Sequence, residues 1–402
     1  MLHSALCPPK LIYDRPEPCI DVSADSSSAG ASFPVADEQP ACSPSVGLDL
    51  PVIDLSPFLQ RSISDAEVFR LSQQIADSLH KTSCLIVRDP RVGIDDSDEF
   101  LDMLERYFAQ SLQAKLADSR PQLHYQVGST PEGVELPKCV MDPAMQQAIA
   151  AQPTAHRATL PQGPDCKWRF MWRLGPRPAQ TSYAELNSPA IIPAGFPNWE
   201  HTMNSWGTKM LAAVEAVAEL AANGLGLPAA AFTSLMEQGP HLLAPTGCNL
   251  EEYGRVGTCI AGFHYDLNFL TIHGRARFPG LFIWLRDGTR VAVKMPAGCL
   301  LLQAGKQLEW LTGGHIRAGM HEVLCTQATV RAMNEAKAAG RSLWRVSSTV
   351  FGHVASDRIL VPLGPFALQP GAASQYPQVA AGAQVQQELD AIRLSSNTAR
   401  PQ

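Results

Sequence analysis

Residues 261–273 read AGFHYDLNFLTIH, a stretch rich in aromatic and β-branched residues, which are typical of β-strands. Side chains at positions i and i+2 of a strand point to the same side. His264 and Asp266 would therefore both reach one ion. His321 follows 55 positions after Asp266 (321 − 266), and this separation allows it to approach from another strand that packs opposite.

Two imidazoles and one carboxylate occupy one face of a metal ion and leave the remaining coordination positions open. This ligand set is associated with non-haem Fe(II) oxygenases. We therefore predict that His264, Asp266 and His321 bind one Fe(II), with no fourth protein ligand.

Further strands are predicted downstream. Residues 280–296 (GLFIWLRDGTRVAVKMP) hold two apolar runs split by Asp287-Gly288, which is a strong hairpin signal. Residues 299–305 (CLLLQAG) and 345–353 (RVSSTVFGH) read as two more strands. A series of short strands with turn signals favours a sandwich or a small barrel, in which distant residues can converge.

The order of these motifs resembles the isopenicillin-N-synthase-like family of Fe(II)/2-oxoglutarate dioxygenases. The matching segments are LPVIDLS (50–56), HYDLNFLT (264–271), GL (280–281), DG (287–288), PAG (296–298), LEWLTGG (308–314), HEV (321–323) and RVS (345–347). The resemblance covers residues ~49–355. It implies an α+β fold, with a double-stranded β-helix (jelly-roll) core, flanking helices and an N-terminal α/β region.

The resemblance also implies an activity and its cofactors. The protein would use Fe(II), 2-oxoglutarate as cosubstrate and O2, with ascorbate as an optional reductant, to hydroxylate, desaturate or cyclise a small-molecule metabolite, as in secondary metabolism. Arg345 and Ser347 would hold the far carboxylate of 2-oxoglutarate. An arginine fork offers paired donors to a carboxylate, and a hydroxyl two residues on points the same way.

The chain departs from the family pattern at two single positions. Asn268 stands where the family has glycine, and Glu322 stands where it has arginine.

A longer departure lies between His321 and Arg345, which are 24 residues apart (345 − 321), farther than in the family. The extra residues, 327–342, predict an exposed helix that ends at Gly340. We expect it outside the barrel wall, near the mouth of the site, between two strands that pair. Arg331 in this helix is the alternative anchor for 2-oxoglutarate, although it lacks the serine that follows Arg345.

Residues 167–178 (KWRFMWRLGPRP) are unusually basic and aromatic. In an alternating strand, Arg169 and Arg173 share one face, where they either hold an anionic substrate or form a solvated basic edge. Phe351 either faces the substrate or is a core phenylalanine. Further candidates are Gln126 and Glu135 for the substrate pocket and Asn249 and Tyr253 for the cosubstrate, whereas His273, His315 and His353 are interpreted as structural or supporting residues.

Composition excludes several classes. The 402 residues carry a net charge of −6, which disfavours nucleic-acid binding. Ten cysteines without a Cys-x-x-Cys pair disfavour zinc ribbons and disulfide scaffolds and favour reduced thiols in the cytoplasm. The apolar segment 209–227 contains two glutamates and an asparagine, so we expect no membrane span. No targeting signal is expected, and the protein is predicted to be a monomer.

The chain divides into four predicted regions. Residues 1–48 are rich in Ser, Ala, Pro and Asp and predict a flexible tail. Residues 49–238 mix strands and helices as the N-terminal α/β region. Two helices are expected near its end, one before and one after the Gly-Leu-Gly-Leu-Pro segment. Residues 239–362 form the strand-rich core. Residues 363–402 are predicted to be a C-terminal tail, with a short helix at 384–394.

Two alternatives to the dioxygenase remain open on the sequence. One is an Fe(II) oxidase of the same fold that does not use 2-oxoglutarate. The other is a non-catalytic relative that binds a ligand or partner.

Overall fold

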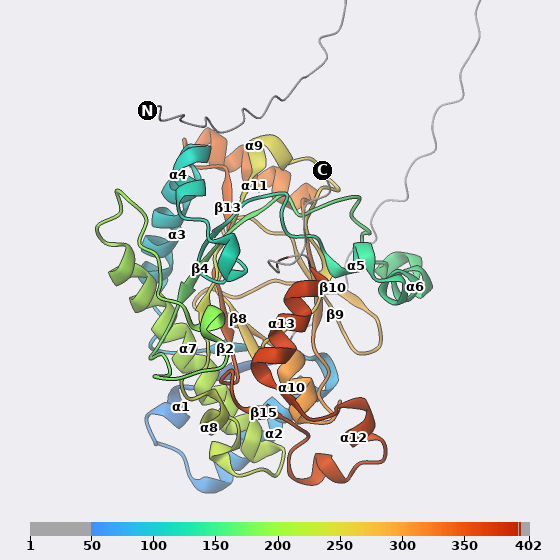
Figure 1. Ribbon diagram of the computed structural model, residues 1–402. Helices are drawn as coiled ribbons and strands as arrows, with labels where there is room; N and C mark the ends of the chain where they lie inside the picture. The colour runs from blue at the N-terminus through green and yellow to red at the C-terminus, as the bar shows by residue number, and fades with distance from the viewer. Residues whose placement is uncertain (1–49, 393, 395–402) are drawn as a thin grey trace, which may run out of the picture. The chain divides into compact units, whose positions relative to one another are not determined.

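The computed structural model describes residues 50–392 and 394, which form two main β-sheets and surrounding helices (Figure 1). The segment 1–48, predicted to be a flexible tail, lies outside the described residues. Strands from residues 49–238 and from residues 239–362 pair within the larger sheet, so the two predicted regions are joined by backbone hydrogen bonds.

The larger sheet has ten strands, and its main path runs β1-β2-β11-β8-β14-β5-β4-β6-β13, with β3 paired to β4. Only the β1–β2 pair is parallel among these described strands. The strands are β1 (Val52–Asp54), β2 (Cys84–Arg88), β3 (Gly128–Thr130), β4 (Trp168–Arg173), β5 (Leu242–Leu243), β6 (Thr246–Asn249), β8 (Leu270–His273), β11 (Leu300–Ala304), β13 (Trp344–Val346) and β14 (Thr349–Gly352). The strand predicted in 50–56 is confirmed as β1, and the buried strand in 299–305 as β11.

The smaller sheet has four antiparallel strands in the order β10-β9-β12-β7. They are β7 (Cys259–His264), β9 (Leu281–Trp284), β10 (Arg290–Ala292) and β12 (Met320–Leu324). β9 and β10 confirm the predicted hairpin. Gly288 in its turn has a φ of 84°, a conformation that favours glycine, and the Asp287 carboxylate accepts a hydrogen bond from the Thr289 N–H at 2.9 Å.

Two of the predicted strands are each divided in two. Residues 261–273 contribute to β7 and form β8, and Asp266 lies in the segment between them. Residues 345–353 contribute to β13 and form β14, with a break at Ser347. The reason is a change of pairing partner. β7 pairs in the smaller sheet and β8 in the larger, while β13 pairs with β6 and β14 with β5 and β8.

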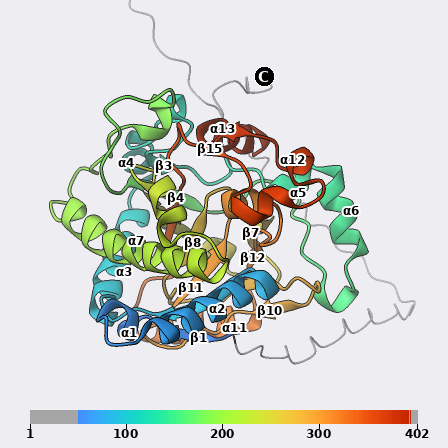
Figure 2. The same ribbon diagram turned by 90° about the horizontal axis from the view of Figure 1, so that it is seen from below.

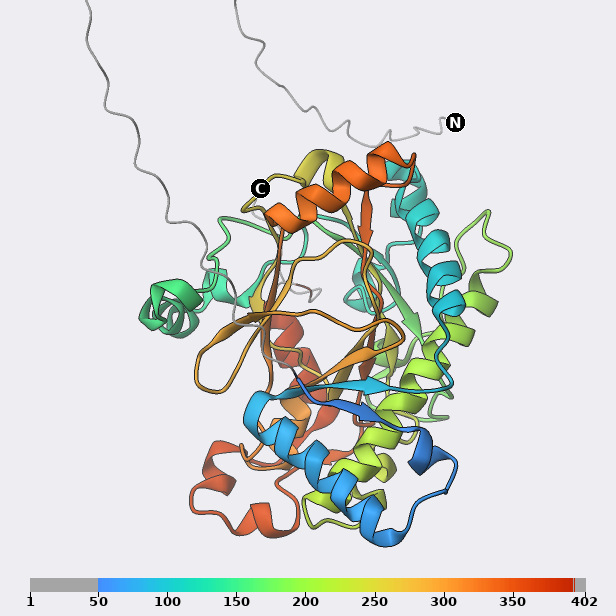
Figure 3. The same cartoon turned by 180° about the vertical axis from the view of Figure 1, so that it is seen from behind.

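The insertion at 327–342 forms the predicted helix, α11 (Gln327–Ala338), the orange helix at the top of Figure 3. The Thr326 side chain caps its start, and Gly340 follows its end with a φ of 61°. The strands on either side of α11 do not pair with each other, contrary to our expectation, because β12 belongs to the smaller sheet and β13 to the larger. α11 therefore connects the two sheets.

The inner face of α11 is buried. Thr329 and Ala336 are enclosed, and Ala336 packs in an apolar cluster with Cys248, Leu250 and Cys325. The Thr329 hydroxyl also donates a hydrogen bond to the Pro279 carbonyl at 3.0 Å. The helix is therefore exposed on one side only.

Two long helices cover the larger sheet. α2 (Asp65–Thr82) begins with a capping box, in which Glu67 accepts from the Ser64 N–H at 2.8 Å. α2 packs against α7 (Trp199–Gly224), and Figure 2 shows the two helices beside one another. α7 ends at the predicted break, where Gly226 has a φ of 72°, and α8 (Thr233–Met236) follows.

The described part of the segment predicted to be a C-terminal tail, residues 363–392, is folded. β15 (Ile359–Leu360) pairs with β16 (Val379–Ala380), and α13 (Ala381–Ala391) follows. The physical reason is an apolar stripe, because Val385 and Leu389 lie one helical turn apart and pack against Leu186. The short helix predicted at 384–394 is confirmed, although it begins earlier.

The remaining helices are shorter than α2 and α7. They are α1 (Ser56–Leu59), α3 (Ile94–Phe108), α4 (Leu112–Ala117), α5 (Lys138–Met141), α6 (Pro143–Ala151), α9 (Leu250–Tyr253), α10 (Lys306–Leu311), α12 (Ala372–Gln375) and the 3₁₀ turns η1 (Pro121–Leu123), η2 (Thr154–His156), η3 (Ala184–Asn187), η4 (Ala229–Ala231) and η5 (Gly364–Leu368). Within residues 50–392, no helix has both the length and the apolar character needed to cross a membrane.

Candidate functional site

Three side chains with metal-ligating atoms meet where the smaller sheet ends. His264 is the last residue of β7, and β12 places His321 directly opposite it. Asp266 lies two residues beyond β7, and its Oδ1 is 3.9 Å from Nε2 of each histidine. One ligand atom from each residue lies within 4.8 Å of the others, and no other such group occurs in the described part of the chain. We call these three residues the triad.

The surroundings of the triad suit a divalent cation. Nδ1 of His264 lies 2.5 Å from the Gly262 carbonyl, a contact that is satisfied when Nδ1 carries the proton and Nε2 keeps its lone pair for a metal. Burial, together with the nearby His321, lowers the pKa of His264 to about 3, so its imidazole is neutral. Oδ2 of Asp266 is buried without a hydrogen-bond partner among the described residues. This donor set fits Fe(II).

A cavity of about 350 Å³ extends from the triad between the two sheets, and we call it the Arg345 cavity. Its wall includes all three triad residues, from the smaller sheet and its edge, and residues of the larger sheet opposite. The wall also includes Lys167, Arg169, Thr246, His273, Pro279, Arg345, Ser347 and Phe351.

Arg345 is a buried cation without an anionic partner. It lies in β13 opposite Cys248 of β6, and only 4 % of its surface is exposed. Its Nε has no hydrogen-bond partner, and within residues 50–392 no carboxylate lies within ion-pair distance of it. Burial lowers the pKa of Arg345 to about 10, so the guanidinium is still charged at neutral pH. A buried unpaired charge is costly, and an anionic ligand would remove that cost.

Ser347 lines the same cavity, although the chain has already left β13 at this residue. Its hydroxyl accepts a hydrogen bond from the Thr246 N–H at 3.0 Å and lies 2.8 Å from the Thr246 hydroxyl. Arg331, the alternative anchor, is exposed on α11 and is absent from the cavity wall. The geometry therefore favours Arg345 over Arg331.

A second, smaller cavity of about 80 Å³ adjoins the triad on its other side. His264, Asp266, Arg169 and Phe351 line both cavities. Most of the remaining wall is apolar and includes Pro137, Met145, Met171, Leu242, Leu267, Leu389 and Ile392. Because Glu388 and Leu389 come from α13, we call it the α13 cavity.

Beside the α13 cavity lies a network of four largely enclosed ionic side chains. Arg169 Nη2 lies 2.8 Å from a carboxylate oxygen of Glu135, and Lys167 Nζ lies 3.4 Å from the other. Lys167 also contacts Asp165, whose second oxygen accepts from the Gly262 N–H at 3.1 Å in β7. Burial alone would raise the pKa of Glu135, but Arg169 and Lys167 hold it at about 2, so the carboxylate stays charged.

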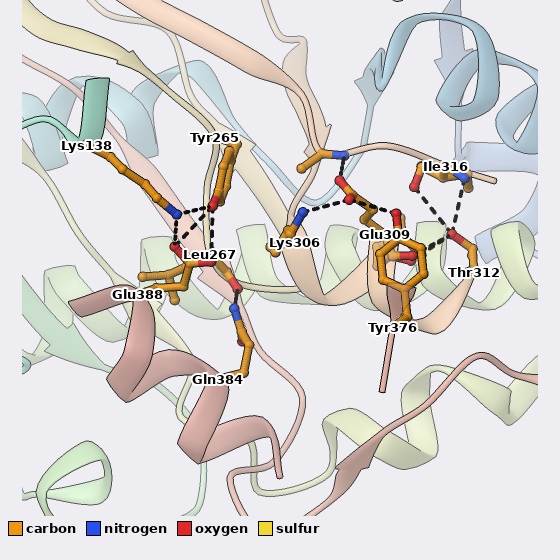
Figure 4. Close-up of polar contacts among 12 residues, drawn as sticks. Lys138, Tyr265, Leu267, Lys306, Glu309, Thr312, Ile316, Tyr376, Gln384 and Glu388 are labelled. Atoms are coloured by element: carbon orange, nitrogen blue, oxygen red, sulfur yellow. Dashed lines mark hydrogen bonds and ion pairs between the residues drawn. The ribbon is translucent and has the colours of Figure 1, made fainter. Parts of the chain in front are cut away.

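Helix α13 makes polar contacts with residues next to the triad in sequence (Figure 4). Glu388 forms an ion pair with Lys138 at 3.2 Å and accepts a hydrogen bond from the Tyr265 hydroxyl at 3.1 Å. Lys138 also donates to Tyr265 at 2.7 Å. Gln384 donates to the Leu267 carbonyl at 3.2 Å. Tyr265 and Leu267 flank Asp266 in sequence, so α13 supports the segment that carries the carboxylate.

Arg173 does not share the position of Arg169. Its guanidinium donates to the Leu174 and Pro176 carbonyls, and it is absent from the walls of both cavities. The alternative of a solvated basic edge is also wrong, because Arg173 is only 6 % exposed and β4 is enclosed on both faces. The structure therefore gives Arg169, but not Arg173, a place near the triad.

The other candidates fall into two groups. Gln126 and Glu135 line the α13 cavity. Asn249 and Tyr253 lie outside both cavity walls, since the Asn249 side chain caps α9 and Tyr253 packs beside the Cys248 cluster. Phe351 faces both cavities and is only partly buried, which favours the substrate-facing interpretation.

The two departures from the family pattern have structural roles. Asn268 donates hydrogen bonds to the carbonyls of Leu270 at 2.8 Å and Gly352 at 3.1 Å, so its amide joins β8 to β14. Glu322 is buried and forms an ion pair with Arg290 at 2.8 Å, which ties β12 to β10.

Two contributions to the α13 cavity, those of His353 and of α13 itself, were not predicted from the sequence. The sequence pattern favours a structural role for His353, yet this residue is on the cavity wall and its buried Nδ1 has no hydrogen-bond partner among the described residues. The available signal was its position two residues after Phe351. The sequence around α13 gives no sign that this helix lies at the site, because even the nearest triad residue is tens of positions away along the chain.

No protein-family model and no curated protein sequence matches the chain. Several solved structures are similar. A protein described as a 2OG-Fe(II) oxygenase family member from Caulobacter crescentus is 21% identical, with a TM-score of 0.65 over 85% of this chain and 98% of the other. A full-length protein from Neurospora crassa, solved in complex with α-KG, is 17% identical, with a TM-score of 0.66 over 88% and 99%. JOX2 in complex with 2OG, Fe and JA is 17% identical, with a TM-score of 0.60 over 89% and 88%. The chain thus has the mixed α/β fold of 2OG-Fe(II) oxygenases.

Proposed function

We propose that this protein is an Fe(II)- and 2-oxoglutarate-dependent dioxygenase that oxidises a small molecule. The observation that carries the proposal is that the triad shares one cavity with a buried guanidinium that has no anionic partner among the described residues. The shared fold supports it, since structures with this fold were solved with α-KG, or with 2OG and Fe.

His264, Asp266 and His321 would hold the Fe(II). When bound, the iron supplies the oxidising chemistry, in which O2 and 2-oxoglutarate are consumed and the substrate is oxidised. The protein's own part is to present two imidazoles and one carboxylate, and to keep the ion in an enclosed position between two cavities.

Arg345 and Ser347 would bind the far carboxylate of 2-oxoglutarate. The guanidinium offers a planar pair of donors, and burial strengthens its attraction for an anion. The Ser347 hydroxyl, held by Thr246, adds a further donor on the same wall. Phe351 and Arg169 lie between this cavity and the α13 cavity, which we assign to the substrate.

We further infer that the strands of residues 239–362 form a double-stranded β-helix core, with residues 49–238 wrapped on its larger sheet. What supports this is the alternation of consecutive strands between the two sheets, as in β7, β8 and β9. A monomer in the cytoplasm remains our proposal, and the seven described cysteines are all free thiols, as in a reducing compartment.

The proposal is tested by loading the full chain with Fe(II) without oxygen and then measuring succinate release from 2-oxoglutarate in air, with ascorbate present. We expect slow release without substrate that depends on added Fe(II) and is lost in Arg345→Met. Arg331→Met is the matched control and should behave as wild type. Absence of both 2-oxoglutarate binding and succinate release in the iron-loaded protein would contradict the proposal, and would favour the oxidase or the non-catalytic alternative.

A further inference from the structure

The charged side chains around the α13 cavity balance one another. Apart from Asp266, the acids and bases of its wall and of the adjoining ionic network are Glu135, Asp165 and Glu388 and Lys138, Lys167 and Arg169. Each of these six contacts a group of opposite charge. The α13 cavity therefore has no spare charge, unlike the Arg345 cavity.

The Glu135–Arg169 pair bears most directly on an anionic substrate. Both side chains are largely enclosed, with 13 % and 12 % of their surfaces exposed. A substrate carboxylate that captured Arg169 would leave Glu135 buried beside it with a like charge. Separating a buried ion pair in this way is strongly unfavourable. The expectation that Arg169 binds an anionic substrate therefore conflicts with its environment.

Besides Oδ2 of Asp266, two polar atoms of residues on this wall have no partner among the described residues. The first is Nε of Arg169, and the second is Nδ1 of His353, a residue only 3 % exposed. The His353 backbone is held by a hydrogen bond from its N–H to the His241 ring at 3.0 Å, so the side chain has a defined place. A neutral imidazole offers one donor and one acceptor, and an uncharged polar group of a ligand can satisfy it.

We propose, resting on the proposed function, that the substrate is an uncharged, mostly apolar small molecule with a polar group that hydrogen-bonds to His353. The apolar wall, including Met171, Leu242 and Leu389, accommodates the body of the molecule. The Glu135–Arg169 pair disfavours carboxylic acids of the same shape.

The experiment compares carboxylic acids with their own primary amides, because each pair has nearly the same shape and differs in charge. A library of such pairs, including phenylacetic acid with phenylacetamide and indole-3-acetic acid with indole-3-acetamide, is screened by ligand-observed NMR. The full chain is loaded with Zn(II) and 2-oxoglutarate so that no turnover occurs. We expect each amide to bind at least about ten times more tightly than its acid. We expect His353→Phe to weaken amide binding by about tenfold.

Two variants test the role of charge. Glu135→Gln releases Arg169 and should improve binding of the acids, whereas Glu135→Gln/Arg169→Gln removes both charges and should not. If Glu135→Gln fails to fold, the double variant and His353→Phe still decide the question.

The proposal is overturned if acids bind as well as amides in the wild type, if no uncharged member binds, or if His353→Phe leaves amide binding unchanged. Binding of 2-oxoglutarate is followed in the same samples. Its loss would count against the proposed function, and its retention with no preference for amides would count only against this inference.

Discussion

The two cavities beside the triad differ in whether the charged side chains on their walls are paired. In the Arg345 cavity, a buried guanidinium has no carboxylate partner among the described residues. In the α13 cavity, Arg169 is also well enclosed but lies 2.8 Å from Glu135. An unmatched buried charge is stable only with a ligand of opposite charge, whereas a matched pair resists such a ligand. An arginine at a site therefore indicates an anionic ligand only when no carboxylate of the protein is already paired with it.

The largest effect should come from the residues of the triad. Asp266→Ala or His321→Ala removes one of three ligands, so the protein should lose its Fe(II) and all succinate release. The check is the iron retained after anaerobic loading and desalting, measured by atomic absorption. His315→Gln, which lies outside both walls, is the matched control and should retain iron. Normal iron content in Asp266→Ala would refute the ligand assignment.

The next effect should be confined to the Arg345 cavity. Arg345→Lys replaces a planar fork by a single ammonium, and loss of a buried charge-assisted pair costs about 2–5 kcal/mol. We expect 2-oxoglutarate affinity to fall by about 30-fold or more, since each ~1.4 kcal/mol is tenfold. Calorimetric titration with 2-oxoglutarate measures it. An equal loss in Arg331→Lys would show that the wrong arginine has been assigned.

A smaller effect should come from the support behind the same cavity. Thr329→Val removes the hydroxyl that donates to the Pro279 carbonyl at 3.0 Å, on a loop of the cavity wall, and disturbs the cap of α11. The free energy of unfolding should fall by about 1–2 kcal/mol, as measured by urea denaturation. Affinity for 2-oxoglutarate should change by no more than about twofold, because a twofold change corresponds to less free energy than one typical hydrogen bond contributes. A stability equal to wild type would mean that α11 contributes nothing through this contact.

The smallest effect should be confined to the α13 cavity. Glu388→Gln removes one charge from a partly exposed pair with Lys138, whose exposed fractions are 16 % and 25 %. Pairs of this kind contribute about 1 kcal/mol or less, so binding of an uncharged ligand should weaken by about fivefold at most. Gln387→Glu, on the exposed face of α13, is the control. A change in 2-oxoglutarate affinity in Glu388→Gln would show that the two cavities are not independent.

Much of the fold could be predicted from local patterns. The hairpin at Asp287-Gly288, the strand β11 and the helix α11 with its glycine end are all confirmed. The errors in the fold concern which strands pair with each other. A run such as 261–273 looks like one strand because its side chains favour strand conformation, but its two halves hydrogen-bond in different sheets. Sequence patterns report conformation, and they do not report which strand lies alongside.

By itself, the sequence determined which residues are candidates for the site. The residue types and their order, through the resemblance to a known family, were enough to predict that His264, Asp266, His321 and Arg345 approach one cavity, and the structure brings them together. Only the tertiary structure decided which charges are paired and what closes the second cavity. Lys138 meets Glu388 across 250 positions of the chain, and folding therefore decided that contact. Long-range packing sets burial and charge pairing, and these two quantities decide which ligand each cavity can hold.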